Sequence, residues 1–273
     1  MDEFKAEQAY NFWESRLPNQ FRQPLLAVES VTGRHTLACL IDGDGKKWFA
    51  KFNEATNNLN EVKALESLNQ DALSRRHVAS FLFDQFKPEV LLTSSLIGNH
   101  PNKTHILKHK ASLVGLLANV HQIQDSSLMK EVDYASLFLP LPEHKLTFWL
   151  SEVATNVMRT HRTSELGFLH GDLVPGNLLL NDTSWFLLDW EFSHVGDVRW
   201  DLASVAVEFA FTLEQFHELC REYSLVRKLD EGRFLTGAKY WILLYLRICL
   251  GWSNANNQPH DKYWQYIENN LLL

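Results

Sequence analysis

The pattern of apolar residues changes in kind near Gly98, and this change constrains the fold more than any other feature of the chain. Before Gly98, alternating apolar residues indicate three successive strands, and a turn sequence joins the last two: 27–31, 36–41 and 47–52, with Asp42-Gly43-Asp44-Gly45 before the third. Glycines in such a turn supply the positive φ of a tight hairpin. A helical stripe over 59–69 and an apolar run over 90–97 follow. We therefore expect a small antiparallel β-rich lobe over residues 1–98.

After Gly98 the apolar spacing becomes helical over long spans, at 113–120 and again at 146–157. Ser112 precedes the first span and is a candidate N-cap. One short hairpin, with strands at 178–180 and 185–188, interrupts the helices. The fold class we expect is therefore α+β and bilobal, with a larger, mostly helical lobe over residues 99–273.

The composition excludes several classes of protein. The chain has 273 residues, 26 Lys and Arg against 33 Asp and Glu, and a net charge of −7 without a basic run, which argues against a nucleic-acid partner. Its three cysteines form no CxxC pair, and the N-terminus shows no signal peptide. The apolar stretch 240–252 contains Arg247 and is shorter than the ~20 residues of a membrane span, so we expect a buried helix. We expect a cytoplasmic protein with no membrane association and no obligate protein partner.

The densest motif is His170-Gly171-Asp172-Leu173-Val174-Pro175-Gly176-Asn177-Leu178. Its H-x-D-L-x-x-x-N order is that of the catalytic loop of kinases, in which the Asp accepts the proton of the substrate hydroxyl and the Asn binds magnesium. Asp172 is therefore the candidate catalytic residue. The alternative is a polar turn in which Asp172 or Asn177 caps the local backbone.

The hairpin after this loop predicts a metal site. If Leu179 faces Leu187, then Asn177 stands opposite Asp189, at a Cα separation of about 4.5–5.5 Å for paired residues. Magnesium prefers oxygen ligands, so one amide and one carboxylate suit it. Asn177 and Asp189 are the candidate metal ligands.

Lys51 ends an apolar strand as the phosphate-binding lysine of kinases does. Glu61 and Glu66 on the next helix are both candidate partners; helical periodicity alone does not choose, and an E-x-x-x-L pattern favours Glu61. Gly33 lies between the first two strands, where it either contacts phosphate or serves a plain β-turn.

Together these motifs resemble the aminoglycoside phosphotransferase and choline kinase superfamily, whose fold is protein-kinase-like. The resemblance covers nearly the whole chain. It includes a hinge strand at Val90–Gly98, with Leu96 as a nucleotide contact, the helix 116–121, and Asp197 with Trp200-Asp201-Leu202-Ala203. It implies ATP and Mg²⁺ as cofactors, with Lys51, Glu61 and Gly33 at the nucleotide, and structural support of the loop by Asp201 and His170. No D-F-G or A-P-E motif is present, which disfavours a protein substrate.

Asp189-Trp190-Glu191-Phe192 resembles the D-x-E-[YF] of choline kinases and bacterial thiamine kinases, whose acceptors are quaternary-nitrogen alcohols. Aromatic faces hold such cations. Glu191 is therefore the candidate counter-charge, and Trp252 and Trp241 are candidate pocket residues, although a Trp on a helix is commonly a core residue.

This resemblance implies an ATP-dependent kinase for a small cationic alcohol, with thiamine as the first choice and choline as the second. The alternatives are an aminoglycoside or other amino-alcohol phosphotransferase and, because of the single glycine at Gly33, a noncatalytic nucleotide-binding relative.

Overall fold

The computed structural model describes residues 3–31, 36–124, 132–160 and 165–272. The chain divides into two compact units: Met1–Gly98 with Phe186–Phe192, and Asn99–Trp185 with Ser193–Leu273. The first unit thus contains a short segment from far along the chain, including Asp189 and Glu191.

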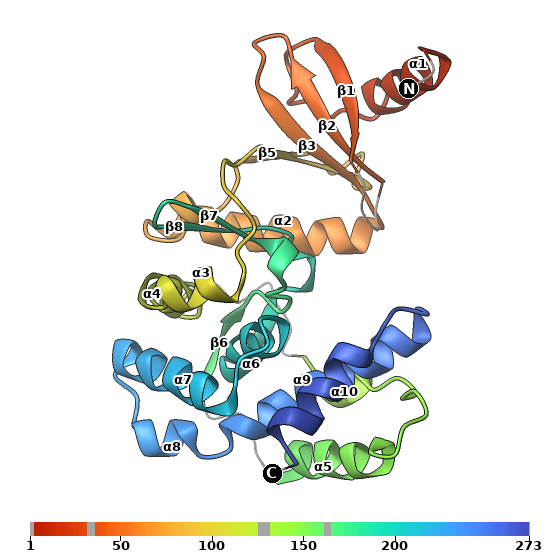
Figure 1. Cartoon of the computed structure of the whole chain (residues 1–273). Coiled ribbons are helices and arrows are strands. Elements are labelled where there is room, and N and C mark those ends of the chain that lie inside the picture. The colour runs from red at the N-terminus through yellow and green to blue at the C-terminus, as the bar shows by residue number, and fades with distance from the viewer. Residues whose placement is uncertain (1–2, 32–35, 125–131, 161–164, 273) are drawn as a thin grey trace. The chain divides into compact units, whose positions relative to one another are not determined.

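The first unit is built on a five-stranded antiparallel sheet (Figure 1). Its strands, in spatial order, are β1 (Leu25–Val31), β2 (Thr36–Asp42), β3 (Lys47–Phe52), β5 (Val90–Ser94) and β4 (Phe81–Phe83). Its helical elements are α1 (Glu3–Glu14), α2 (Ala55–Gln70) and the 3-10 turns η1 (Arg75–His77) and η5 (Trp190–Phe192). The three strands and the helix expected near the N-terminus are present, and β4 and α1 are additions that the apolar pattern did not indicate.

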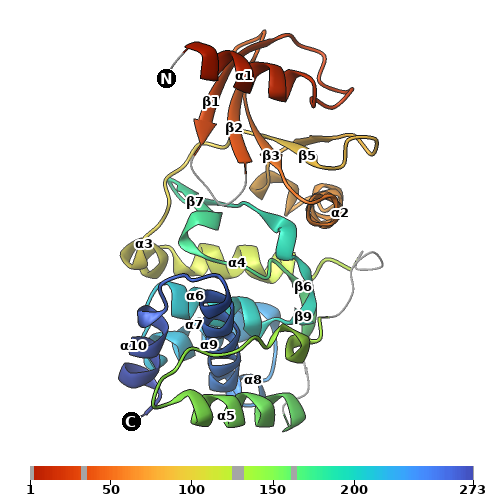
Figure 2. The same ribbon diagram turned by 90° about the vertical axis from the view of Figure 1, so that its right-hand side faces the viewer.

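The turn before β3 shows how the sequence fixes the register of the sheet. Gly45 adopts the left-handed φ of 77°. Asp42 Oδ1 accepts hydrogen bonds from the backbone N–H groups of Asp44 and Lys46, at 3.0 and 2.9 Å. Its Oδ2 accepts a third from Trp48 Nε1 at 2.9 Å. Trp48 is thereby directed into the core, where Trp13 of α1 also packs, and Figure 2 shows α1 lying across the strands.

The second unit is mainly helical. Its helices are α3 (Lys103–Lys108), α4 (Lys110–Val120), α5 (Thr147–Thr160), α6 (Arg199–Glu208), α7 (Leu213–Arg227), α8 (Glu231–Leu235), α9 (Ala238–Ala255) and α10 (Asp261–Asn270), with 3-10 turns η3 (Tyr134–Leu137) and η4 (Pro175–Asn177). β6 (Leu166–Leu169) pairs antiparallel with β9 (His194–Asp197), a pair that was not expected. β7 (Leu178–Asn181) and β8 (Ser184–Leu187) form the expected hairpin as a separate two-stranded sheet.

Packing explains the outcome of two predictions in this unit, the N-cap at Ser112 and the buried helix at 240–252. Ser112 does not cap a helix: α4 already begins at Lys110, and the Ser112 hydroxyl accepts a hydrogen bond from Trp185 Nε1 at 3.0 Å. The apolar stretch 240–252 is the buried helix we expected. By length and composition the longer run 231–255 would pass for a membrane span, but 61% of its most apolar window is buried inside the protein.

The architecture is the α+β class expected from the sequence, with an antiparallel sheet in the N-terminal unit and helices in the C-terminal unit. Within the second unit α6 and α9 lie side by side in both views (Figures 1 and 2). Of the two, α6 carries the side chains that hold the predicted catalytic loop.

Candidate active site

The loop that follows β6 is held by a buried carboxylate. Asp201, fully buried on α6, accepts hydrogen bonds from the backbone N–H groups of His170 at 2.8 Å and Gly171 at 3.0 Å. Gly171 has a φ of 85°, which a residue with a side chain rarely adopts. Asp201 therefore supports the loop as the family resemblance implied, and it is not the N-cap of α6, since that position belongs to Val198.

Successive turns of α6 contact the loop on either side of Asp172. Trp200 Nε1 donates to the carbonyl of Gly171 at 2.9 Å, and the hydroxyl of Ser204 accepts from the N–H of Leu173 at 3.1 Å. Residues four apart lie on the same face of a helix. This face of α6, which we call the template face, therefore positions the backbone around Asp172.

The charge of Asp201 is stabilised despite its burial. Burial alone raises the pKa of this carboxyl, but hydrogen bonding and charge from His121, the charge of His170 and the Gly171 N–H outweigh it, and the pKa is lowered. His121 Nε2 lies 3.2 Å from Asp201, and its Nδ1 lies 2.8 Å from the Tyr223 hydroxyl. His121 and His170 are satisfied core groups.

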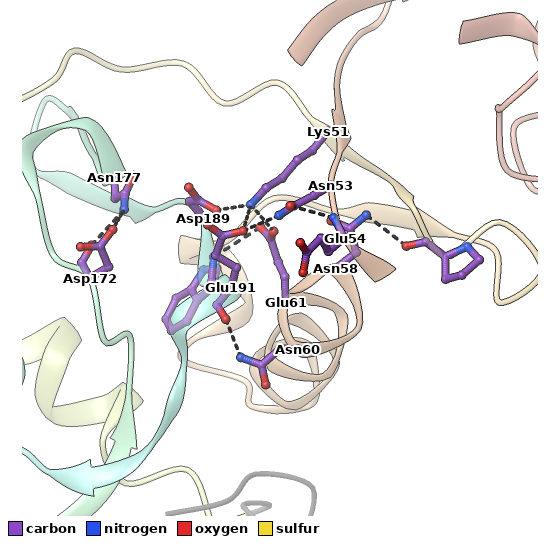
Figure 3. A network of polar contacts seen from close by, with 12 residues as sticks. Lys51, Asn53, Glu54, Asn58, Asn60, Glu61, Asp172, Asn177, Asp189 and Glu191 are labelled. Atoms are coloured by element: carbon purple, nitrogen blue, oxygen red, sulfur yellow. Dashed lines mark hydrogen bonds and ion pairs between the residues drawn. The ribbon is translucent and has the colours of Figure 1, made fainter. Parts of the chain in front are cut away.

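Within the loop, Asn177 is oriented by Asp172. The Asn177 amide donates from Nδ2 to the backbone carbonyl of Asp172 at 2.9 Å and to its Oδ2 at 3.0 Å (Figure 3). Because Nδ2 is the atom that faces Asp172, the Asn177 Oδ1 is the atom left to accept a ligand. The two predicted residues are therefore brought together, with the amide oxygen facing away from the carboxylate.

In the first unit, the ammonium of Lys51 contacts three carboxylates (Figure 3). It lies 3.1 Å from Glu61 Oε2 and 2.8 Å from Glu191 Oε2, and it also contacts Asp189. Helical periodicity had left Glu61 and Glu66 both possible. The structure shows that Glu61 is the partner of Lys51, whereas Glu66 is exposed. Glu61 Oε1 also accepts from the backbone N–H of Trp190 at 3.3 Å, which ties α2 to η5.

Burial and opposite charge set the pKa values of this cluster. Burial by itself lowers the pKa of Lys51, but the charges of Glu61, Asp189 and Glu191 outweigh that effect and raise it. Burial raises the pKa of Glu61 to about 7, against the opposing influence of Lys51. Lys51 therefore stays charged, whereas Glu61 titrates near neutral pH.

Glu191, the predicted counter-charge of the acceptor, is held by residues of the first unit. Its side chain is 4% exposed and is engaged by Lys51 and by Asn53, whose Nδ2 donates to Oε2 at 2.6 Å. Its backbone carbonyl accepts from Asn60 at 2.7 Å. The Glu191 carboxylate is thus a partner of Lys51, because the η5 turn directs it toward β3 and α2, and its role as the counter-charge of the acceptor stays a prediction.

Asp189 has a strained backbone, with a φ of 62°, and its side chain is 35% exposed. A non-glycine residue held at positive φ is a common feature of functional sites. Asp189 lies in the first unit and Asn177 in the second, so their predicted opposition across the hairpin stays a prediction.

The remaining candidates differ in their settings. Gly33 lies outside the described residues. Leu96 is half-buried just after β5. Trp252 is half-buried on α9, whereas Trp241 is 2% exposed and packs edge-on against Tyr134. The placement of Trp241 favours the core alternative, and Trp252 remains a candidate.

Glu208, a carboxylate that we did not predict from the sequence, lies one turn beyond Ser204 on the template face of α6. Glu208 follows Ser204 by four residues, a rise of about 6 Å along the helix. Its side chain is only 3% exposed. The signal available in the sequence was this i, i+4 spacing after Trp200 and Ser204, on a helix that is otherwise almost entirely buried.

Two tyrosines direct their hydroxyls to Glu208. Tyr245 on α9 and Tyr263 on α10 both donate to Glu208 Oε1, at 3.1 and 3.0 Å. Burial first, then the charges of Glu208 and its neighbours, raise the pKa values of both tyrosines and of the Cys249 thiol between them. Asp172 is close enough to contribute to the raised pKa of Tyr245 and of Cys249. The second unit therefore holds a buried carboxylate that accepts two tyrosine hydroxyls, on the helix that holds the loop around Asp172.

The chain belongs to the phosphotransferase enzyme family, whose defining sequence pattern matches residues 40–235. Among curated proteins, it is 23% identical over 235 residues to protein LicA of Haemophilus influenzae, covering 81% of this chain and 67% of LicA. It is 27% identical over 150 residues to the thiamine kinase of Escherichia coli, covering 51% of this chain and 52% of that enzyme. The chain thus spans about half the length of the thiamine kinases it matches.

Solved structures share the fold. The crystal structure of choline kinase LicA from Streptococcus pneumoniae aligns with a TM-score of 0.68 at 18% identity, covering 97% of each chain. Amicoumacin kinase hAmiN in complex with AMP-PNP, Ca²⁺ and Ami aligns with a TM-score of 0.69 at 13% identity, covering 98% of this chain and 94% of that one. The fold is therefore that of small-molecule kinases that bind nucleotides.

Proposed function

We propose that this protein is an ATP-dependent kinase that transfers the γ-phosphoryl group to the hydroxyl of a cationic alcohol, with thiamine as first choice and choline as second. The observation that carries the proposal is the placement of Glu208 on the helix face that holds the loop around Asp172. A nearly buried carboxylate with two tyrosines is a suitable partner for an organic cation.

Asp172 orients the acceptor hydroxyl and accepts its proton. Phosphoryl transfer depends mainly on positioning and on charge stabilisation, so a carboxylate held at one place is the main requirement for the nucleophile. The hydrogen bonds from α6 to Gly171 and Leu173 supply that rigidity on either side of Asp172.

Asn177 and Asp189 are the proposed holders of Mg²⁺, and their chemistry fits it. Asn177 offers Oδ1, since its Nδ2 is used on Asp172, and the half-exposed Asp189 offers carboxylate oxygen. Across the described parts of the chain, no three His, Cys, Asp or Glu side chains are grouped as a metal site. The bound ion would neutralise charge on the β- and γ-phosphates.

Lys51 is the proposed phosphate contact, with Glu61 fixing its position. The ammonium has three N–H donors, and all three carboxylates around it lie within ion-pair distance. A phosphate oxygen can therefore bind Lys51 only by replacing one carboxylate, and half-exposed Asp189 is the most accessible of the three. Leu96, and Gly33 outside the described residues, remain proposed nucleotide contacts on the resemblance alone.

An acceptor screen tests the proposal. ADP release would be measured with ATP, Mg²⁺ and one of five acceptor types: thiamine, choline, ethanolamine, homoserine or an aminoglycoside. We expect acceptor-dependent ADP with thiamine or choline, and a rise of at least tenfold in the KM for that acceptor in Glu208→Gln, with the exposed Glu214→Gln as the matched control.

Two outcomes would contradict the proposal. Turnover only with an aminoglycoside or another amino-alcohol would assign a different acceptor to the same chemistry. Nucleotide binding without acceptor-dependent ADP from any of the five would favour a noncatalytic relative.

A further inference from the structure

The cation that contacts Glu208 in this structure belongs to the protein itself. Lys262, in the first turn of α10, places its ammonium 2.7 Å from Glu208 Oε2. The same ammonium lies 4.6 Å from the centre of the Tyr263 ring. A carboxylate on one side and an aromatic ring on another are the two features by which proteins hold organic ammonium groups.

The two carboxylate oxygens of Glu208 have different partners, and Lys262 therefore competes directly with an incoming cation. Oε1 of Glu208 already accepts both tyrosine hydroxyls, and Oε2 is the oxygen that Lys262 occupies. Lys262 is also the outer partner, since its side chain is 58% exposed and that of Glu208 is 3% exposed. An acceptor cation arriving from solvent therefore meets Lys262 before it reaches Glu208.

We propose that Lys262 is a specificity-determining residue, an internal ammonium that occupies the cation position at Glu208 and that the acceptor has to displace. This inference rests on the proposed function. Glu208 is buried, so an unpaired carboxylate there is unfavourable, and Lys262 neutralises it in the unliganded protein. The same pairing weakens acceptor binding, since the Lys262–Glu208 contact is lost each time an acceptor binds.

Calorimetric titration of thiamine, with choline as the second probe, into the whole protein tests this. Lys262→Met keeps the length of the side chain and removes its charge. Partly exposed ion pairs contribute little to stability, so we expect the Kd of the cationic probe to fall by only about threefold to fivefold. Lys145→Met is the matched control, because Lys145 is an exposed lysine paired with Glu268 at 2.8 Å.

The outcomes separate this inference from the proposed function. A tighter Kd in Lys262→Met alone, with weaker binding in Glu208→Gln, supports both. An unchanged or weaker Kd in Lys262→Met, with weaker binding in Glu208→Gln, overturns the role of Lys262 and leaves the cation site in place. Absence of thiamine and choline binding to the wild type and to Lys262→Met overturns the cation site and the inference together.

Discussion

The Oε2 of Glu191 lies 2.8 Å from the ammonium of Lys51, although the sequence had suggested that Glu191 faces the acceptor. Two residues on either side of Trp190 thereby serve the same lysine, since Asp189 also contacts it. Both acidic residues of the D-x-E motif therefore form ion pairs with Lys51.

The pairing of Glu191 predicts a nucleotide effect for its neutral variant. Glu191→Gln replaces the ion pair with Lys51 by a hydrogen bond from the ammonium to a neutral amide oxygen, which holds Lys51 less firmly in place for phosphate, a difference of about 1 kcal/mol, or roughly fivefold. We expect the KM for ATP to rise by that factor while the KM for the acceptor stays within twofold. Steady-state kinetics with each substrate varied would decide it, and Glu66→Gln, an exposed change on α2, is the control. A selective rise in the acceptor KM would instead support Glu191 as the counter-charge of the acceptor.

Replacing the loop carboxylate should separate binding from turnover. Asp172→Asn retains the shape of the side chain but cannot accept the hydroxyl proton, so we expect kcat to fall by about 10²–10⁴. Nucleotide affinity, measured by calorimetry, should change less than threefold. Asp182→Asn, an exposed change in the β7–β8 turn, should leave both quantities unchanged. Wild-type turnover in Asp172→Asn would exclude Asp172 as the base.

The pKa of Glu61 predicts two pH effects of opposite sign. Burial raises this pKa from 4.5 to about 7, so the ion pair with Lys51 is complete only above neutral pH. We expect kcat/KM for ATP to rise with pH through about 7. In Glu61→Gln this rise in kcat/KM should be absent.

Stability should change in the other direction. A group whose folded pKa is raised contributes stability that is full below its unfolded pKa of 4.5 and lost as pH rises through about 7. The free energy of unfolding of the wild type, relative to Glu61→Gln, should therefore decrease between pH 5 and 8. Urea unfolding across that range would measure it, and a difference independent of pH would contradict the raised pKa.

Removing the charge of Asp201 should destabilise the second unit as well as the loop. Asp201→Asn turns one acceptor oxygen into a donor facing backbone N–H groups, which leaves buried groups unpaired at a cost of about 2–4 kcal/mol. We expect a lower melting temperature by calorimetry and a reduced kcat at temperatures where the variant is folded. A wild-type melting temperature would contradict the support role, and Asp182→Asn again serves as the control.

The sequence was sufficient for features that local chemistry determines. The Asp42–Gly45 turn and the alternating strands of the first unit depend on near neighbours, and they were predicted. The loop and its asparagine were also predicted, because H-x-D-L-x-x-x-N is a contiguous motif. Ser112 shows the limit even of local signals, since the break at His109 sets the start of α4.

Features that depend on contacts between distant segments were not predictable. Helical spacing put both Glu61 and Glu66 within reach of Lys51, and only the packing of α2 against η5 separates the buried residue from the exposed one. Glu208 acquires its setting from Tyr245 and Tyr263, on two helices that a single sequence does not place beside α6.

Helix α6 carries both the supports of the loop and the carboxylate of the proposed cation site, and one rigid element therefore fixes the span between them. Glu208 stands one turn, about 6 Å along the axis, past the serine that holds Leu173. An alcohol whose charged nitrogen and hydroxyl are too many or too few bonds apart for this span would dock at Glu208 and stay unphosphorylated. Molecular length, and not charge alone, would then decide which alcohols are substrates and which are only inhibitors.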